Sequence, residues 1–161
     1  MRRVSTLIAA LLLAACASTP SPTTPHTSIP PGLEPIAAAY LDLVAQSNKD
    51  TCTFNAALSQ SAPTLADLKQ ASAAYVKTLA TLIDGLRELD WPAALTDDAK
   101  ALTDALATNQ GHTRAMAEAD SMSTFIAADN QLIESNKISA AAANKLRTDL
   151  GLGAGGNPCA T

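Results

Sequence analysis

The strongest constraint on the fold is a stripe of mainly apolar residues between positions 65 and 89, which recur at alternating intervals of three and four. The stripe consists of Leu65, Leu68, Ser72, Tyr75, Leu79, Leu82, Leu86 and Leu89. This spacing places the side chains on one face of an α-helix, while charged residues such as Lys69 and Asp84 fall on other faces. A stripe of this length predicts a helix that packs at a shallow angle along its neighbours.

Three further segments carry apolar stripes with helical spacing. The segment at about 36–60 is predicted to present Tyr40, Leu41, Val44, Phe54 and Leu58. The segment at about 95–118 is predicted to present Leu95, Ala99, Leu102, Leu106, Asn109, Thr113 and Met116. The last segment is predicted to begin after a polar break near residue 120, to end at Gly151, and to present Phe125, Ile126, Leu132, Ile133, Ala142, Leu146 and Leu150.

Turn signals separate these segments. Pro63, with Ser61 before it, is predicted to start the second helix, and Trp91-Pro92 is predicted to end it. Of the 161 residues 34 are Ala, the strongest helix former, and no stretch alternates between apolar and polar residues as a strand does. We therefore predict an all-α fold, an antiparallel up-down-up-down four-helix bundle over residues 36–151.

The first 15 residues are typical of a cleaved signal peptide. Arg2 and Arg3 precede an apolar stretch at 4–15. Those twelve residues span only about 18 Å as a helix, against about 30 Å for the hydrocarbon core of a bilayer, so a transmembrane helix is not expected.

The end of this segment, Leu13-Ala14-Ala15-Cys16, resembles the lipobox of bacterial lipoproteins. The resemblance implies that the Cys16 thiol receives a diacylglycerol thioether, that the signal peptide is cut before Cys16, and that acyl chains such as palmitate anchor the protein. Two acyl chains make a stable anchor, whereas one chain binds a membrane only reversibly. The expected location is the extracytoplasmic face of the cell membrane or envelope. The alternative is an ordinary signal peptide whose last small residue happens to be Cys.

Two segments outside the bundle differ from it in composition. Between residues 17 and 35 lie six of the nine prolines and seven Ser or Thr residues, so we expect residues 16–35 to form a disordered stalk. Residues 152–161 form a Gly-rich tail. Without Arg2 and Arg3 the chain has 9 basic and 15 acidic residues, a net charge of −6, which disfavours nucleic acid as a partner.

Cys52 and Cys159 remain once Cys16 is assigned to the lipid, and pairing is the rule in an oxidising compartment. Cys52 lies 16 residues, about 24 Å, along the first predicted helix, so the tail must fold back along the bundle to reach it. The eight steps from Gly151 to Cys159 reach roughly 26 Å, which is enough. We predict a Cys52–Cys159 disulfide, with two free thiols as the alternative.

No catalytic constellation, metal site or cofactor site is predicted. His26 and His112 have no partners at ligand spacing. Tyr40 and Tyr75 could meet across the first two helices and serve as axial haem ligands, although core packing is the favoured interpretation.

Polar intrusions near the predicted seams are of more interest. Asn48, Asn55 and Asn109 either line a small polar ligand site or, in the interpretation we favour, fix the register of the helices or are half-exposed amides.

The whole arrangement of stalk, Trp91-Pro92 junction and closing Leu150-Gly151-Leu152 resembles small helical lipoproteins of actinobacteria. The resemblance implies location and fold but no particular chemistry. The expected function is a non-enzymatic interaction or scaffolding module, anchored to the membrane through Cys16, whose partner is an unidentified envelope protein. The alternative is a carrier of a small ligand or haem in an interhelical cavity lined by Tyr40, Tyr75 or Asn48.

Overall fold

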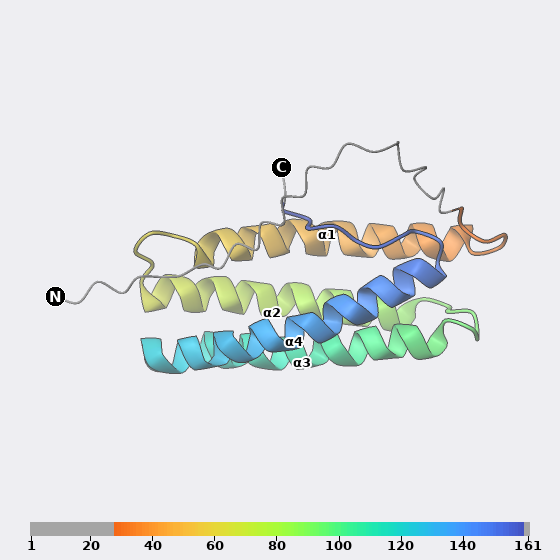
Figure 1. Ribbon diagram of the computed structural model, residues 1–161. Coiled ribbons are helices and arrows are strands. Elements are labelled where there is room, and N and C mark those ends of the chain that lie inside the picture. Colours follow the sequence, from red (N-terminus) through yellow and green to blue (C-terminus); the bar gives the residue numbers. More distant parts are fainter. Residues whose placement is uncertain (1–27, 160–161) are drawn as a thin grey trace, which may run out of the picture.

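The computed structural model describes residues 28–159, and every regular element in this part of the chain is an α-helix. The helices are α1 (Glu34–Leu58), α2 (Leu65–Glu88), α3 (Thr96–Glu118) and α4 (Met122–Asp149). They run alternately up and down, joined by short turns (Figure 1), which confirms the predicted four-helix bundle. Among these helices, none combines the length and the apolar character that crossing a membrane requires. The predicted signal peptide, Cys16 and most of the stalk lie outside the described residues.

The stripes predicted for the second and third segments form the core. In α2 the side chains of Leu68, Ser72, Leu79, Leu82 and Leu86 are buried. In α3 the whole predicted stripe is buried, from Leu95 through Asn109 and Thr113 to Met116. Each of these two helices packs against two others, α2 against α1 and α3, and α3 against α2 and α4. Alternate spacings of three and four therefore identify the core-facing residues of α2 and α3.

The predicted stripe of α4 is wrong at two positions. Ile126 is 51% exposed and Ile133 is 49% exposed, whereas Phe125 and Leu132 beside them are buried. Consecutive residues of a helix point about 100° apart, and α4 packs mainly on α3 alone, so its buried face is too narrow for both residues of each adjacent pair. The same reason leaves Leu41 exposed next to buried Tyr40 in α1.

The start of α2 differs from the prediction by two residues. The helix begins at Leu65 and not at Pro63, and Thr64 is its capping residue. The Thr64 hydroxyl accepts a hydrogen bond from the Asp67 amide at 3.2 Å. The Asp67 carboxylate in turn accepts hydrogen bonds from the Thr64 amide at 3.2 Å and from the Thr64 hydroxyl at 2.6 Å. This reciprocal capping box satisfies amides that the first turn of a helix leaves free, and it lowers the pKa of Asp67. At the start of α4, Ser121 is the capping residue, in the polar break predicted near residue 120.

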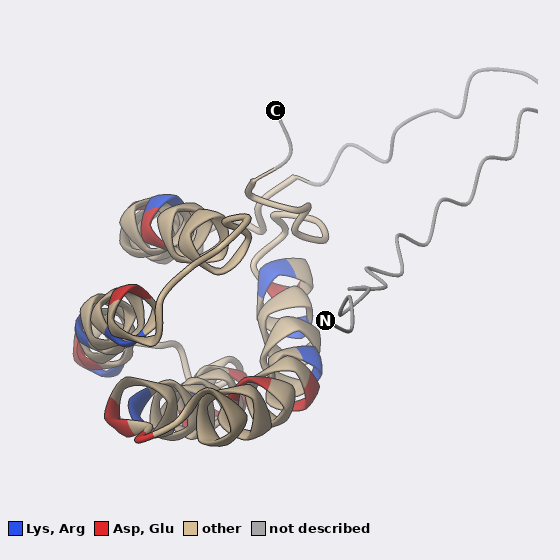
Figure 2. Ribbon diagram, turned by 90° about the vertical axis from the view of Figure 1, so that its left-hand side faces the viewer, with Lys and Arg blue, Asp and Glu red and all other residues tan. Residues whose placement is uncertain are grey.

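The four helices do not close into a ring of contacts. Among the described residues α1 packs on α2, α2 on α3 and α3 on α4, but α1 and α4 have little direct contact. Viewed along the helices (Figure 2), the C-terminal tail occupies the side between α1 and α4. Figure 1 shows α4 crossing the bundle obliquely and the tail returning along α1. The fold is thus an open bundle with a fifth, non-helical segment on its open side.

A sharp reversal at the end of α4 starts the tail on this path. The Leu152 amide donates to the Arg147 carbonyl at 2.8 Å, and the Gly151 amide donates to the Thr148 carbonyl at 2.9 Å. This pair of hydrogen bonds is the Schellman motif, which requires a left-handed residue, and Gly151 has φ 73°. A Cβ atom at Gly151 would also lie 2.7 Å from the Ser28 carbonyl oxygen. Glycine is therefore required here both by the turn and by the close approach of the chain preceding α1.

We expect Thr64→Ala to lower the free energy of unfolding by about 1 kcal/mol, because it removes the hydroxyl that caps α2. Denaturant unfolding followed by circular dichroism measures the change. Thr53→Ala is the matched control, since Thr53 lies exposed within α1 and bonds only its own helix. Equal stability of the two variants would contradict a stabilising role for the cap.

Candidate functional site

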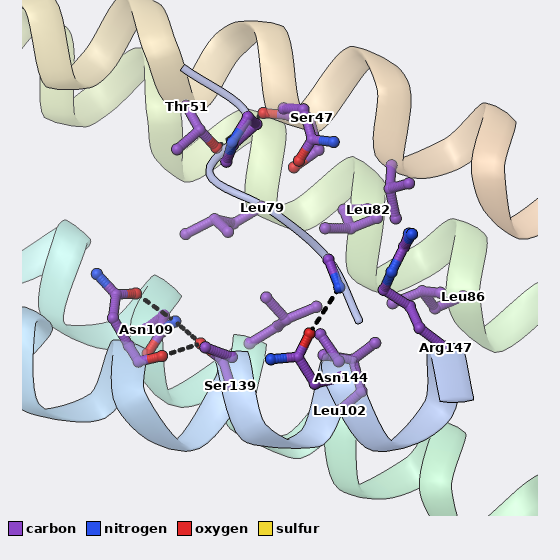
Figure 3. A pocket seen from close by; sticks show the side chains of 18 of the residues that line it. Ser47, Thr51, Leu79, Leu82, Leu86, Leu102, Asn109, Ser139, Asn144 and Arg147 are labelled. Carbon is purple, nitrogen blue, oxygen red and sulfur yellow. Dashed lines mark hydrogen bonds between the residues drawn. The ribbon is translucent and has the colours of Figure 1, made fainter. Parts of the chain in front are cut away.

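A cavity of about 640 Å³, partly open to solvent, lies between the helices, and all four helices and the tail contribute to its wall. One side is apolar, formed by Leu79, Leu82 and Leu86 of α2 with Leu102 and Leu106 of α3. Figure 3 shows Leu79, Leu82, Leu86 and Leu102 along this side of the cavity. The volume falls within the range of about 300–1,000 Å³ that is typical of small-molecule sites.

The cavity lies between α1 and α4, which have little direct contact. Some of the residues that these helices contribute are small, such as Ser47 of α1 and Ser139, Ala140 and Ala143 of α4. A close-packed bundle fills facing positions with leucine-sized side chains. The separation of the two helices, together with these small residues, leaves space between them.

The C-terminal tail covers this space. Residues 155–158 line the cavity, and the disulfide between Cys52 and Cys159, with a Cα–Cα distance of 5.3 Å, ties the end of the tail to the middle of α1. This confirms the predicted pairing and the predicted return of the tail. On the opposite side, Arg147 Nε donates to the Gly153 carbonyl at 3.1 Å, and the Gly155 amide donates to Asn144 Oδ1 at 2.9 Å. The tail is therefore attached to both α1 and α4.

The residues proposed to line a ligand site, Tyr40, Tyr75 and Asn48, all border this cavity. The two tyrosines are not brought together, however. The Tyr75 hydroxyl lies 3.0 Å from Thr51 Oγ1, whereas Tyr40 packs edge-on against Trp91 with ring centroids 6.3 Å apart. Thr51 lies 11 residues, about 16 Å, beyond Tyr40 along α1. The phenol groups thus lie at different levels, and the arrangement gives no support to a haem held between them.

The three asparagines singled out in the sequence also border the cavity. Asn48 and Asn55 are exposed, whereas Asn109 is only 3% exposed, so of the two favoured interpretations register-fixing and not half-exposure applies to Asn109. Its Nδ2 donates to Asn136 Oδ1 at 2.8 Å and to Ser139 Oγ at 2.9 Å (Figure 3). Its Oδ1 is buried and has no hydrogen-bond partner among the described residues. A buried carbonyl without a donor costs free energy, while the amide hydrogen bonds of Asn109 join α3 to α4 at one register.

No sequence pattern singled out the polar residues that α4 contributes to the cavity, which are Asn136, Ser139, Asn144 and Arg147. Their contribution depends on the oblique path of α4 and on the tail, neither of which the stripe pattern specifies.

The lining offers hydrogen bonds, apolar surface and one charge. Arg147 is the single charged side chain among the described residues that border the cavity. Across residues 28–159, no three His, Cys, Asp or Glu side chains gather closely enough to hold a metal ion. This combination of groups is suited to binding an amphiphilic molecule.

Comparison of the chain with models of protein families, with curated proteins and with solved structures finds no match.

Removal of the disulfide should weaken the fold and release the tail. A Cys52→Ala, Cys159→Ala double variant is expected to lose about 4–5 kcal/mol of unfolding free energy on the chain-entropy model, because the bridge spans a sequence separation of 107. Denaturant unfolding in the absence of reductant measures this loss. Reduced wild-type protein serves as the control and should match the double variant. A loss below about 1 kcal/mol would contradict the role given to the bridge.

Both tyrosines should resist ionisation. Burial raises the pKa of Tyr40, against a smaller lowering effect of nearby Arg147, and burial likewise raises the pKa of Tyr75, against the hydrogen bond with Thr51. Tyrosine in the unfolded chain releases its proton near pH 10. The unfolded state therefore binds fewer protons than the folded state above pH 10, and stability falls as the pH rises through that range. Because the chain has only 2 Tyr, the near-ultraviolet absorbance of tyrosinate reports both groups. Ionisation at pH 10 in the folded protein would contradict their burial.

Proposed function

We propose that this protein is a membrane-anchored, non-enzymatic carrier that binds a small, mainly apolar ligand in the cavity between its helices. The observation that carries the proposal is the cavity itself, about 640 Å³ in volume, bounded by leucines on one side and covered by a disulfide-tied tail. Of the two functions expected from the sequence, a scaffolding module needs no interior space, whereas a carrier does. The cavity therefore favours carriage, and scaffolding stays a prediction.

The apolar lining supports the same choice. Leucines of α2 and α3 present apolar surface to a space that solvent can enter, and removing such surface from water is favourable by about 25 cal/mol per Å². An apolar ligand that covers these leucines gains that free energy.

The anchor is proposed from the sequence alone. The lipobox-like Leu13-Ala14-Ala15-Cys16 supports lipidation at Cys16, and the proline-rich stalk supports display of the bundle away from the bilayer. In a bacterial host, Cys16→Ala should shift the protein from the membrane fraction to a soluble fraction. Retention of this variant in the membrane would contradict the anchor without bearing on the cavity.

A cavity-filling substitution tests the binding site. Ala143→Phe places a large side chain into the space from α4 and should weaken binding of a neutral, environment-sensitive fluorescent probe at least about tenfold, because it removes the volume the probe needs. Fluorescence titration of the mature protein with its disulfide intact is the measurement.

Ala141→Phe is the matched control for this experiment, since Ala141 lies exposed on another face of the same helix and does not border the cavity. It should bind the probe as the wild type does. Equal binding by all three proteins would place the probe elsewhere, and absence of binding to the wild type would overturn the proposed function.

A further inference from the structure

The charge distribution of the cavity is one-sided. Arg147, near the end of α4, is the single charged residue among those that line it within the described part of the chain. The protein as a whole is acidic, with a formal net charge of −4. Arg147 is therefore a lone positive group in the cavity of an acidic protein.

Arg147 is partly buried, and its contacts leave its charge uncompensated. Its Nε donates to the Gly153 carbonyl at 3.1 Å, but among residues 28–159 its guanidinium forms no ion pair with any carboxylate. A guanidinium carries five N–H donors in a planar fork that matches a carboxylate or phosphate group. Removing such a group from water is costly unless an anion approaches it.

A second donor lies at the same place. The Tyr40 side chain, 2% exposed, borders the same cavity as Arg147, which lowers the pKa of this phenol against the larger effect of burial. Arg147 is fixed there by its backbone as well, because its carbonyl accepts the Leu152 amide in the turn that ends α4. A phenol and a guanidinium that line one cavity can both donate to the oxygens of one anionic group.

The rest of the cavity suits a hydrocarbon chain. In Figure 3 the guanidinium of Arg147 lies at one end, beside Leu86, and Asn109 with Ser139 lies at the other. Between them run Leu79, Leu82 and Leu102. The positions of Ser139 and Arg147, eight residues apart in α4, indicate a length of about 12 Å for this path.

We infer that the ligand is a single-chain amphiphile whose anionic head, a carboxylate or phosphate, is bound by Arg147 and Tyr40 while its chain lies along the leucines. This inference rests on the proposed carrier function and specifies its ligand. The competing explanation is that Arg147 only clamps the tail through Gly153.

A matched pair of ligands separates these explanations. Dodecanoate and dodecanol, each below its critical micelle concentration, are titrated into the mature, disulfide-bonded protein by displacement of the neutral fluorescent probe. Charge-assisted hydrogen bonds to Arg147 should make the carboxylate bind about tenfold more tightly than the alcohol. Arg147→Gln should bring the carboxylate close to the alcohol, whereas Arg87→Gln, on the exposed face of α2 and away from the cavity, should retain the wild-type preference.

Each other outcome has a defined meaning. Equal binding of acid and alcohol to the wild type, or equal loss of both in Arg147→Gln, would overturn the anionic head and leave Arg147 as a clamp. Binding of the probe without displacement by either ligand would overturn the single-chain amphiphile but not the carrier. Absence of probe binding would overturn the carrier function itself.

Discussion

The covalent bond between Cys52 and Cys159 holds the C-terminal tail across the side of the bundle where α1 and α4 do not meet. Without it, the tail would be attached to α4 only through the turn at Gly151 and the contacts of Asn144 and Arg147. A Gly-rich segment has high conformational entropy when free, so these few polar contacts alone are a weak restraint. The disulfide removes most of that conformational freedom, so that the tail forms a stable side of the cavity.

The division of the core into two clusters explains why a bundle with so few aromatic residues can keep a cavity. The core is divided into a cluster around Leu79, Leu86 and Leu146 and a second cluster around Phe54, Met116 and Phe125. The stacked rings of Phe54 and Tyr75, 4.5 Å apart, lie close to the disulfide-bearing part of α1. The cavity adjoins the first cluster and ends where the second begins, so helix packing at the far end is not interrupted by it.

Local patterns in the sequence were sufficient for the elements and for much of the core. Leucines spaced by three and four predicted the buried faces of α2 and α3, and the length of the tail predicted its return to Cys52. The cavity was not predictable in this way, because it depends on how far apart α1 and α4 lie and on the oblique course of α4. Ser47 and Ser139 are unremarkable in sequence, and only their opposition across the bundle gives them significance. Arg147 was likewise overlooked, since one basic residue near a helix end is ordinary and its lack of a carboxylate partner is a property of the fold.

The central claim is that a ligand enters the space between the leucines and the tail. NMR of methyl-labelled leucines in the mature protein, during titration with a long-chain carboxylate, tests this claim most directly. Leucines far from the cavity serve as controls within the same sample. The account predicts shifts at the methyl groups of Leu79, Leu82, Leu86, Leu102 and Leu106, which border the cavity. It predicts unchanged signals for Leu68 and Leu132, which belong to the second cluster. Shifts spread over both clusters, or none at the cavity leucines, would contradict the account.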